Sequence, residues 1–285
     1  MPRFKISVLL PALLLLGWIL PRSHAQNGLV TVDVPSSQET DCTGISSSGI
    51  VVGYYVNSRG VNHGFALVQG SFKYFDVPGA QATFPYGINS LNHAVGWYQD
   101  TNFVTHGFLY IAGKVTTLDP PGSVLTNAWS INNSDTVVGT FVDGSEVHHG
   151  FTYSHGAYTT YNAPNAILTV MTGINASGQI DGYYDDSSGN QHGFTLSNGK
   201  FSSFDYPGAA DTVATRINDS AEIVGYYGAS GLGPFSGYLE NKGGFNTVNF
   251  PGASETRVLG INKAGTVVGR YTDFSGVVHG FMGTP

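Results

Sequence analysis

The sequence predicts an all-β fold, a six-bladed β-propeller with four strands in each blade. One pattern recurs six times along the chain and reads roughly G-I-N-x-x-G-x-V-V-G-Y-Y, then H-G-F, then X-G, then F-D-x-P-G. Equivalent isoleucines mark the six units, four times 43 residues apart and once 44: Ile45, Ile88, Ile131, Ile174, Ile217 and Ile261. A period of about 40–45 residues that contains four short strand signals is the size of one propeller blade.

Each unit contains four expected strands, which we letter A to D from the axis outward. In the first unit strand A spans residues 40–45, strand B is V-V-G-Y-Y at 51–55, and strand C begins at H-G-F. A two-residue turn with glycine in second place, Gln69-Gly70, joins strands C and D, as two-residue hairpins prefer. Strand D ends in D-x-P-G, where the proline stops the ladder.

The two ends of the chain complement each other. Residues 29–34 have the pattern of a D strand, whereas the chain stops after a C strand at residues 277–282. We therefore expect the N-terminal strand to complete the last blade and close the ring, because this leaves no open sheet edge. A linear solenoid is the alternative, but it would need capping repeats that the pattern does not contain.

Residues 1–25 have the three parts of a secretory signal peptide, and residues 26–285 are expected to form a single propeller domain. A basic start precedes an apolar stretch at 6–20, and the tripeptide at 23–25 is a small-x-small cleavage site. A membrane anchor is the alternative, but about 15 apolar residues are fewer than the ~20 that span a bilayer. We therefore expect a protein secreted to the periplasm or the extracellular space, with no membrane insertion after cleavage.

The charge balance argues against two classes of partner. Removal of residues 1–25 takes away three basic residues and no acidic one, which leaves 9 basic and 19 acidic residues. Such a chain is not expected to bind nucleic acid or an anionic membrane surface.

The sequence contains no H-E-x-x-H, G-x-S-x-G, phosphate-loop or dinucleotide motif, so we expect no metal and no cofactor. We expect a monomer.

The motifs G-I-N, V-V-G-Y-Y and H-G-F at this spacing resemble the HAF repeats of bacterial secreted proteins, which are named for a His-Ala-Phe tripeptide. The tripeptide reads His-Gly-Phe in five of the six units, beginning with His63, and Ser-Gly-Tyr at Ser236 in the fifth unit along the chain. Glycine thus replaces the alanine of the family throughout. The resemblance covers residues 26–285 and implies an extracellular bacterial repeat protein of the β-propeller type. It implies no activity and no residue role.

The histidine of H-G-F and the acid of F-D are expected to pair across strands C and D. With a two-residue turn between the strands, His63 lies directly opposite Asp76, and cross-strand neighbours on one face are in contact. The same arithmetic predicts four complete pairs: His63–Asp76, His106–Asp119, His192–Asp205 and His279–Asp33. We interpret the pairs as structural hydrogen bonds. Metal ligation is the alternative, but zinc needs three or four ligands that converge on one point.

Candidate ligand-binding residues lie on the innermost strand, where the repeats disagree. The residues four and two places before each isoleucine vary between units, and Arg216 replaces a glycine just before Ile217. Both rows are expected near the axis, at the face that carries the D–A and B–C loops. The candidate set at this axial mouth is Asp41, Phe84, Tyr86, Asn127, Trp129, Arg216 and Arg257. Aromatic walls with a few polar groups are the usual form of a ligand site. The alternative is that these side chains only plug the channel.

These features favour a secreted, non-enzymatic binding or scaffold module for a glycan, or for an extracellular or cell-envelope partner. The alternative is a glycan-active enzyme, a polysaccharide lyase or a glycosidase, with its site at the axial mouth. A glycosidase uses two carboxylates, but only Asp41 belongs to the candidate set. A lyase could use Tyr86 as the base and Arg257 to neutralise charge. A purely structural protein without a ligand is a third possibility.

Overall fold

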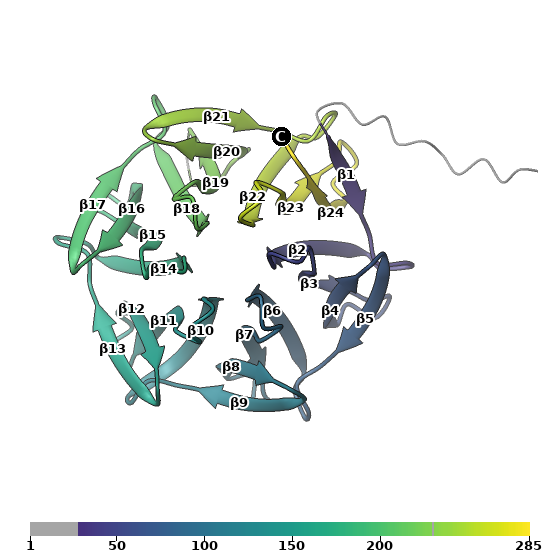
Figure 1. Cartoon of the computed structure of the whole chain (residues 1–285), viewed down its shortest axis with the longest axis horizontal. Helices are drawn as coiled ribbons and strands as arrows, with labels where there is room; N and C mark the ends of the chain where they lie inside the picture. Colours follow the sequence, from purple (N-terminus) through teal and green to yellow (C-terminus); the bar gives the residue numbers. More distant parts are fainter. Residues whose placement is uncertain (1–27, 230) are drawn as a thin grey trace, which may run out of the picture.

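The computed structural model describes residues 28–229 and 231–285. In these two ranges the chain forms 24 β-strands arranged around a central axis, with β2, β6, β10, β14, β18 and β22 innermost (Figure 1). The predicted signal peptide, residues 1–25, lies outside the described residues.

No helix within the described ranges has the length and apolar character to cross a membrane.

Four of the sheets contain four strands each. The first is β2 (Glu39–Ile45), β3 (Val51–Val56), β4 (Asn62–Val68) and β5 (Ser71–Phe75), and the second is β6 (Ala82–Ile88), β7 (Ala94–Gln99), β8 (Thr105–Ile111) and β9 (Lys114–Leu118). The third is β18 (Asp211–Ile217), β19 (Ile223–Gly228), β20 (Ser236–Asn241) and β21 (Gly244–Val248). The fourth is β22 (Glu255–Ile261), β23 (Val267–Thr272), β24 (Val278–Gly283) and β1 (Leu29–Val32).

A fifth, larger sheet contains eight strands. Its strands are β10 (Ser123–Ile131), β11 (Val137–Asp143), β12 (His148–Ser154), β13 (Ala157–Tyr161), β14 (Leu168–Ile174), β15 (Ile180–Asp185), β16 (Gln191–Ser197) and β17 (Lys200–Phe204). A single parallel bridge, His148 to Leu168, joins β12 to β14 and so connects the strands of the third and fourth sequence repeats.

The all-β propeller is confirmed, but the expected six separate blades are wrong. The structure has four four-stranded blades and one eight-stranded sheet, because the bridge at His148 merges two repeats into one hydrogen-bonded unit. The expected closure also needs correction. β1 does pair with β24, with Leu29 opposite Gly283 and Val32 opposite Gly280. Among the described residues, however, no backbone ladder runs on from this sheet to the next, so the ring is not closed by strand hydrogen bonds.

Side chains packed between adjacent sheets form the core. The group between the last and first repeats contains Val32 and Val34 from the N-terminal segment, Cys42 and Phe65 from the first repeat and Val268 from the last. All five are buried, and Phe65 and Val268 are fully inaccessible. The sheets are therefore held around the ring mainly by apolar burial, at roughly 25 cal/mol per Å² of surface removed from water.

A row of asparagine side chains near the axis links consecutive repeats. The Oδ1 atom of Asn89 accepts hydrogen bonds from the backbone N–H groups of Leu91 and His93, which caps the turn as the N-x-x-G pattern predicts. The Nδ2 atom of Asn89 reaches the next repeat and donates to the Asn132 carbonyl oxygen at 3.0 Å. The equivalent amides repeat this contact, and Asn262 donates across the chain ends to the Ser46 carbonyl at 3.4 Å.

Candidate functional site

The innermost hairpin of each repeat contains a β-bulge that shapes the axis. Cys42 pairs with Gly53 and Gly44 with Val52, which leaves Thr43 as the extra residue. The equivalent extra residues of the other repeats are Tyr86, Trp129, Thr172, Thr215 and Leu259. A bulge redirects the side chain that it carries, and all five of these side chains line one cavity on the axis.

This cavity, which we call the axial pocket, has a volume of about 210 Å³. Five members of the sequence-predicted set line it: Asp41, Tyr86, Trp129, Arg216 and Arg257. The cavity is many times larger than the ~10–15 Å³ that one water needs. The axial pocket can therefore accept a small molecule or the end of a longer one.

Two predicted residues do not line the axial pocket. The Phe84 ring lies parallel to the Trp97 ring, with 3.7 Å between centroids, and meets the Tyr54 ring edge-on at 5.0 Å. Phe84 is thus buried behind the aromatic wall and supports it. Asn127 is the register partner of Thr140 and is also absent from the lining. The ligand-binding role of Phe84 and Asn127 stays a prediction, and the structure places both residues outside the lining of the axial pocket.

Four lining residues on the second strand of the hairpin were not predicted from the sequence: Tyr54, Tyr183, Tyr226 and Arg270. Each follows the glycine of V-V-G and is the register partner of a residue four before the isoleucine, as Tyr54 is of Asp41. Directly opposed residues of an antiparallel pair point to the same face. The signal was therefore present in the hairpin register and in the variability of this position between repeats.

Arg216 forms the floor of the axial pocket. Its Nη1 atom donates to the carbonyl oxygens of Trp129 (3.0 Å) and Thr172 (3.2 Å), and its Nη2 atom to those of Tyr86 (2.9 Å) and Thr43 (3.3 Å). One guanidinium thus binds four other repeats at once. Arg216 therefore blocks the channel along the axis, as the alternative interpretation expected. The axial pocket on one side of Arg216 stays open.

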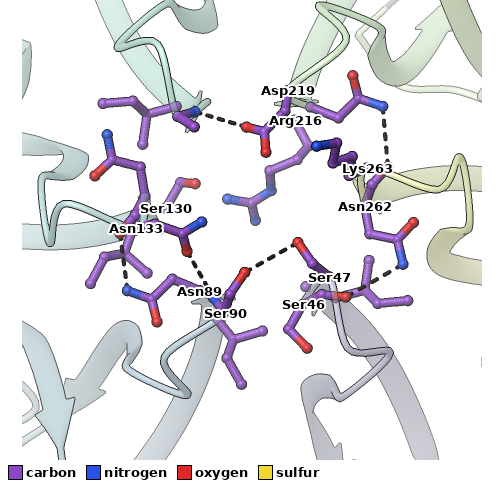
Figure 2. A pocket seen from close by; sticks show the side chains of 18 of the residues that line it. Ser46, Ser47, Asn89, Ser90, Ser130, Asn133, Arg216, Asp219, Asn262 and Lys263 are labelled. Carbon is purple, nitrogen blue, oxygen red and sulfur yellow. Dashed lines mark hydrogen bonds between the residues drawn. The ribbon is translucent and has the colours of Figure 1, made fainter.

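A second, smaller cavity of about 70 Å³ lies on the other side of Arg216, among the turns that join the first and second strands of the repeats. Figure 2 shows the Arg216 side chain extending into the middle of these turns, with Asn89, Ser90, Asn262 and Ser46 around it. Arg216 therefore separates two cavities on one axis.

Asp181 is the charged neighbour of Arg216. It replaces a valine that the other five repeats have at this place of V-V-G, and it is fully buried. Burial raises the pKa of Asp181 to about 7, although the positive charge of Arg216 acts in the opposite direction. Burial likewise lowers the pKa of Arg216 to about 10, against the effect of Asp181. The two departures from the repeat pattern thus compensate each other in charge.

The walls of the axial pocket are aromatic and carry hydroxyl groups. The Tyr86 and Trp129 rings meet edge-to-face with centroids 4.5 Å apart, and the Tyr54 ring is 6.2 Å from that of Tyr86. Burial raises the pKa of Tyr54, Tyr86, Tyr183 and Tyr226. Their hydroxyls therefore stay protonated at neutral pH, where they can donate and accept hydrogen bonds.

Two further arginines of the axial pocket are each in contact with a carboxylate. Arg270 Nη1 lies 3.4 Å from Asp41 Oδ1, and Arg257 Nε donates to Glu255 Oε1 at 2.7 Å. Burial raises the pKa of Asp41, while Arg270 opposes this shift. The Asp41 Oδ2 and Trp129 Nε1 atoms are buried and have no hydrogen-bond partner among the described residues.

The predicted histidine pairs lie away from the axis, at the outer strands. The Nδ1 atom contacts the carboxylate in all four: His63–Asp76 at 2.8 Å, His106–Asp119 at 2.7 Å, His192–Asp205 at 2.9 Å and His279–Asp33 at 2.8 Å. No group of three His, Cys, Asp or Glu side chains suited to a metal occurs within residues 28–229 and 231–285. Each pair is a separate contact between a histidine on the third strand of a repeat and the aspartate that directly follows the outermost strand.

The partners of the second histidine nitrogen differ between repeats. His192 Nε2 faces Asp186 at 3.4 Å, so a carboxylate lies at each ring nitrogen and both bonds together require the protonated imidazole. His63 Nε2 instead faces Asn57 Nδ2 at 2.8 Å. The Oδ1 atom of Asn57 already accepts two backbone N–H groups, so its amide must donate to an unprotonated Nε2.

We expect the His192 contribution to stability to depend on pH. Hydrogen bonds to Asp205 and Asp186 outweigh desolvation and raise the pKa of His192, so its contribution is full below ~6.5 and fades as the pH rises through the folded value. Backbone N–H groups, first that of Asn190, lower the pKa of Asp186 to about 2. The contribution of Asp186 is therefore present above ~3.9 and is lost as the pH falls toward 2.

His192→Gln should thus lower the melting temperature by a few degrees between about pH 4 and 6.5, and less at pH 8. His63→Gln is the matched control, because the second ring nitrogen of His63 faces the Asn57 amide and not a second carboxylate. Thermal scans of both variants from pH 4 to 8 check this. Equal, pH-independent losses would show that His192 acts through packing alone.

Comparisons with known proteins find the fold and no family. No family model matches the chain, and no curated protein matches it. Among solved structures, a variant of the Aleuria aurantia lectin in complex with Fucα1-6GlcNAc has a TM-score of 0.55 at 9% identity, over 89% of this chain and 93% of the lectin. The β-propeller domain of the Trilobed protease from Pyrococcus furiosus has a TM-score of 0.54 at 8% identity, over 87% and 95%. AofleA from Arthrobotrys oligospora has a TM-score of 0.52 at 14% identity, over 78% and 76%. At such identities the likeness shows the β-propeller fold alone.

Proposed function

We propose that this protein is a non-enzymatic β-propeller module that binds a glycan in the axial pocket. The axial pocket itself carries the proposal: aromatic rings and hydroxyl groups surround a cavity that Arg216 closes on one side. Sugars combine apolar C–H faces with hydroxyls, and a few well-placed polar groups among aromatic walls provide orientation and specificity. Asp41 and Trp129 line the axial pocket, and their buried Oδ2 and Nε1 atoms have no hydrogen-bond partner among the described residues.

The solved structures support the choice of ligand class. The Aleuria aurantia lectin, which shares the fold, is described in complex with Fucα1-6GlcNAc. A fucosylated glycan therefore belongs in any test panel for this chain. The axial pocket, not the likeness, determines where we place the ligand.

The geometry favours binding over catalysis. Asp41 is the one acidic residue among the described lining residues, whereas hydrolysis of a glycosidic bond uses two carboxylates. Tyr86, the candidate base of a lyase, has its pKa raised by burial, so it is a poor proton acceptor at neutral pH. Incubation with a panel of polysaccharides should give binding without new reducing ends or unsaturated products. Product formation would establish an enzyme instead.

Trp129→Ala and Tyr86→Ala should each weaken glycan binding at least about tenfold, because aromatic anchors dominate the energy of such contacts. Tyr74→Ala is the matched control, since Tyr74 is an exposed tyrosine on β5. Calorimetric titration with the best glycan of the panel checks this, and melting curves confirm folding. Wild-type affinity in both pocket variants would move the site away from the axis.

We also propose that the protein is exported and acts outside the cytoplasm, in the periplasm or the extracellular space, as expected of a HAF-repeat protein. The pattern of residues 1–25 supports this proposal. Mass spectrometry of protein from the periplasm and the culture medium should find a chain that starts at Gln26. A full-length chain retained in the cytoplasm would contradict it.

A further inference from the structure

Two arginines lie directly opposite each other in one wall of the axial pocket. Arg257 on β22 and Arg270 on β23 are register partners, so both side chains leave the same face of the hairpin. Like charges placed directly opposite in a strand pair are unfavourable. No other innermost hairpin of the chain has two arginines at these positions. The two guanidiniums therefore repel each other unless nearby groups offset their charge.

Arg257 is held in place while part of its guanidinium remains free. Its Nε atom donates to Glu255, and its Cζ atom lies 4.5 Å from the Phe235 ring centre and 5.0 Å from that of Tyr226. No well-aligned hydrogen bond of the Arg257 Nη atoms occurs among the described residues, although the guanidinium lies near Tyr226 and opposes the rise of the Tyr226 pKa that burial causes. A guanidinium fixed through Nε and by ring contacts is preorganised to bind a carboxylate through its two terminal nitrogens.

Neutralisation of the second arginine is weak. Arg270 meets Asp41 through one long contact of 3.4 Å. Asp41 is almost fully buried, and only its Oδ1 atom contacts Arg270, while its Oδ2 atom has no hydrogen-bond partner among the described residues. Arg216 lies at the floor, but its charge is opposed by Asp181, and its terminal nitrogens already donate to four carbonyls. The free donors of the axial pocket are thus concentrated at Arg257 and Arg270.

We infer that the axial pocket recognises an acidic sugar residue, a hexuronic acid, whose carboxylate binds Arg257 and Arg270 while its ring contacts the aromatic wall. The inference rests on the proposed function, and it names the sugar class. A carboxylate between the two guanidiniums offsets their repulsion, and bidentate pairing supplies geometric selectivity. The wall of Tyr86 and Trp129 favours an anion carried on a ring over a bare inorganic ion.

The test compares sugars that differ at one carbon. Methyl glycosides of galacturonic, glucuronic and mannuronic acid are titrated into the protein by calorimetry, each beside its neutral hexose and its uronate methyl ester. At least one free uronate should bind about tenfold or more tighter than both neutral partners. The preference should shrink as salt is raised, because the interaction is partly electrostatic.

The variants separate charge from geometry. Arg257→Lys keeps the charge but loses the bidentate fork, so the ratio of uronate affinity to neutral-sugar affinity should fall to near one. Lys73→Gln is the control, since it removes one exposed positive charge on β5, outside the axial pocket. Melting curves establish that both variants fold.

Each result has a distinct meaning. Equal binding of uronate and neutral sugar, abolished by Trp129→Ala, would overturn the acidic-sugar inference and leave the proposed function standing. Binding of inorganic phosphate as strong as that of every uronate would also overturn it. Absence of binding by any sugar in the panel would overturn both the inference and the proposed function.

Discussion

Replacement of Arg216 by alanine should lower the free energy of unfolding by about 3–5 kcal/mol, the usual cost of removing one partner from a buried charged network. Four carbonyl oxygens would lose their donors, those of Thr43 and Thr172 in buried contacts and those of Tyr86 and Trp129 in half-buried ones. An unsatisfied buried acceptor costs free energy that water-exposed groups do not. Urea unfolding at pH 7 measures the loss, and a change below about 1 kcal/mol would contradict the role of Arg216 as a central clamp.

Asp181→Val provides the control for this prediction. The pKa of Asp181 is about 7 in the folded protein and ~3.9 in an unfolded chain, so folding becomes less favourable as the pH rises from about 4 to 7. Valine removes that dependence and restores the side chain of the other repeats. The double variant Arg216→Ala with Asp181→Val should be more stable at pH 7 than Arg216→Ala alone, because no buried carboxylate is then left unpaired.

Deletion of residues 26–36 should have an effect as large, or prevent folding altogether. This segment contains β1, whose Leu29 and Val32 are buried, and the buried Val34 that follows it. Full burial of each such side chain contributes about 1.5–3 kcal/mol, and β24 would become an open edge. An unchanged melting temperature would show that the pairing of β1 with β24 contributes little.

Single substitutions on β1 separate packing from edge pairing. Val32→Ser should destabilise the protein clearly, because Val32 faces the core, whereas Val30→Ser should be close to neutral, because Val30 is exposed. Both keep the backbone bonds to β24. Similar losses in the two variants would contradict the assigned orientation of the strand.

Local pairings were predictable from the sequence because they depend on short hairpins. Two-residue turns fix the register, and His63 therefore meets Asp76, with positive φ at Gln69 and Gly70 as the turn requires. The turn-capping role of Asn89 follows from the same local geometry. The merging of the third and fourth repeats into one sheet does not follow from local geometry. It depends on a single bridge between His148 and Leu168, which lie in segments separated by a whole strand and a turn.

The candidate site was predictable in part. Tyr86 and Trp129 were predicted because the position two residues before the repeated isoleucine varies between repeats. Such variation indicates positions that packing does not dictate. Arg270 was missed because the register partner on the second strand was not followed across the hairpin. The contacts of a long flexible side chain depend on the tertiary structure. The hydrogen bonds from Arg216 to four other repeats therefore could not be predicted from the repeat pattern.

The most direct test of the axial pocket uses Trp129 as its own reporter. The chain has three tryptophans, Trp18, Trp97 and Trp129, so a protein that starts at residue 26 and carries Trp97→Phe retains only Trp129, on the pocket wall. We expect a saturable change in its fluorescence on titration with a bound glycan, at the same affinity that calorimetry gives, and no such change in the Tyr86→Ala background. Calorimetric binding of the glycan with constant Trp129 emission would contradict a ligand site in the axial pocket.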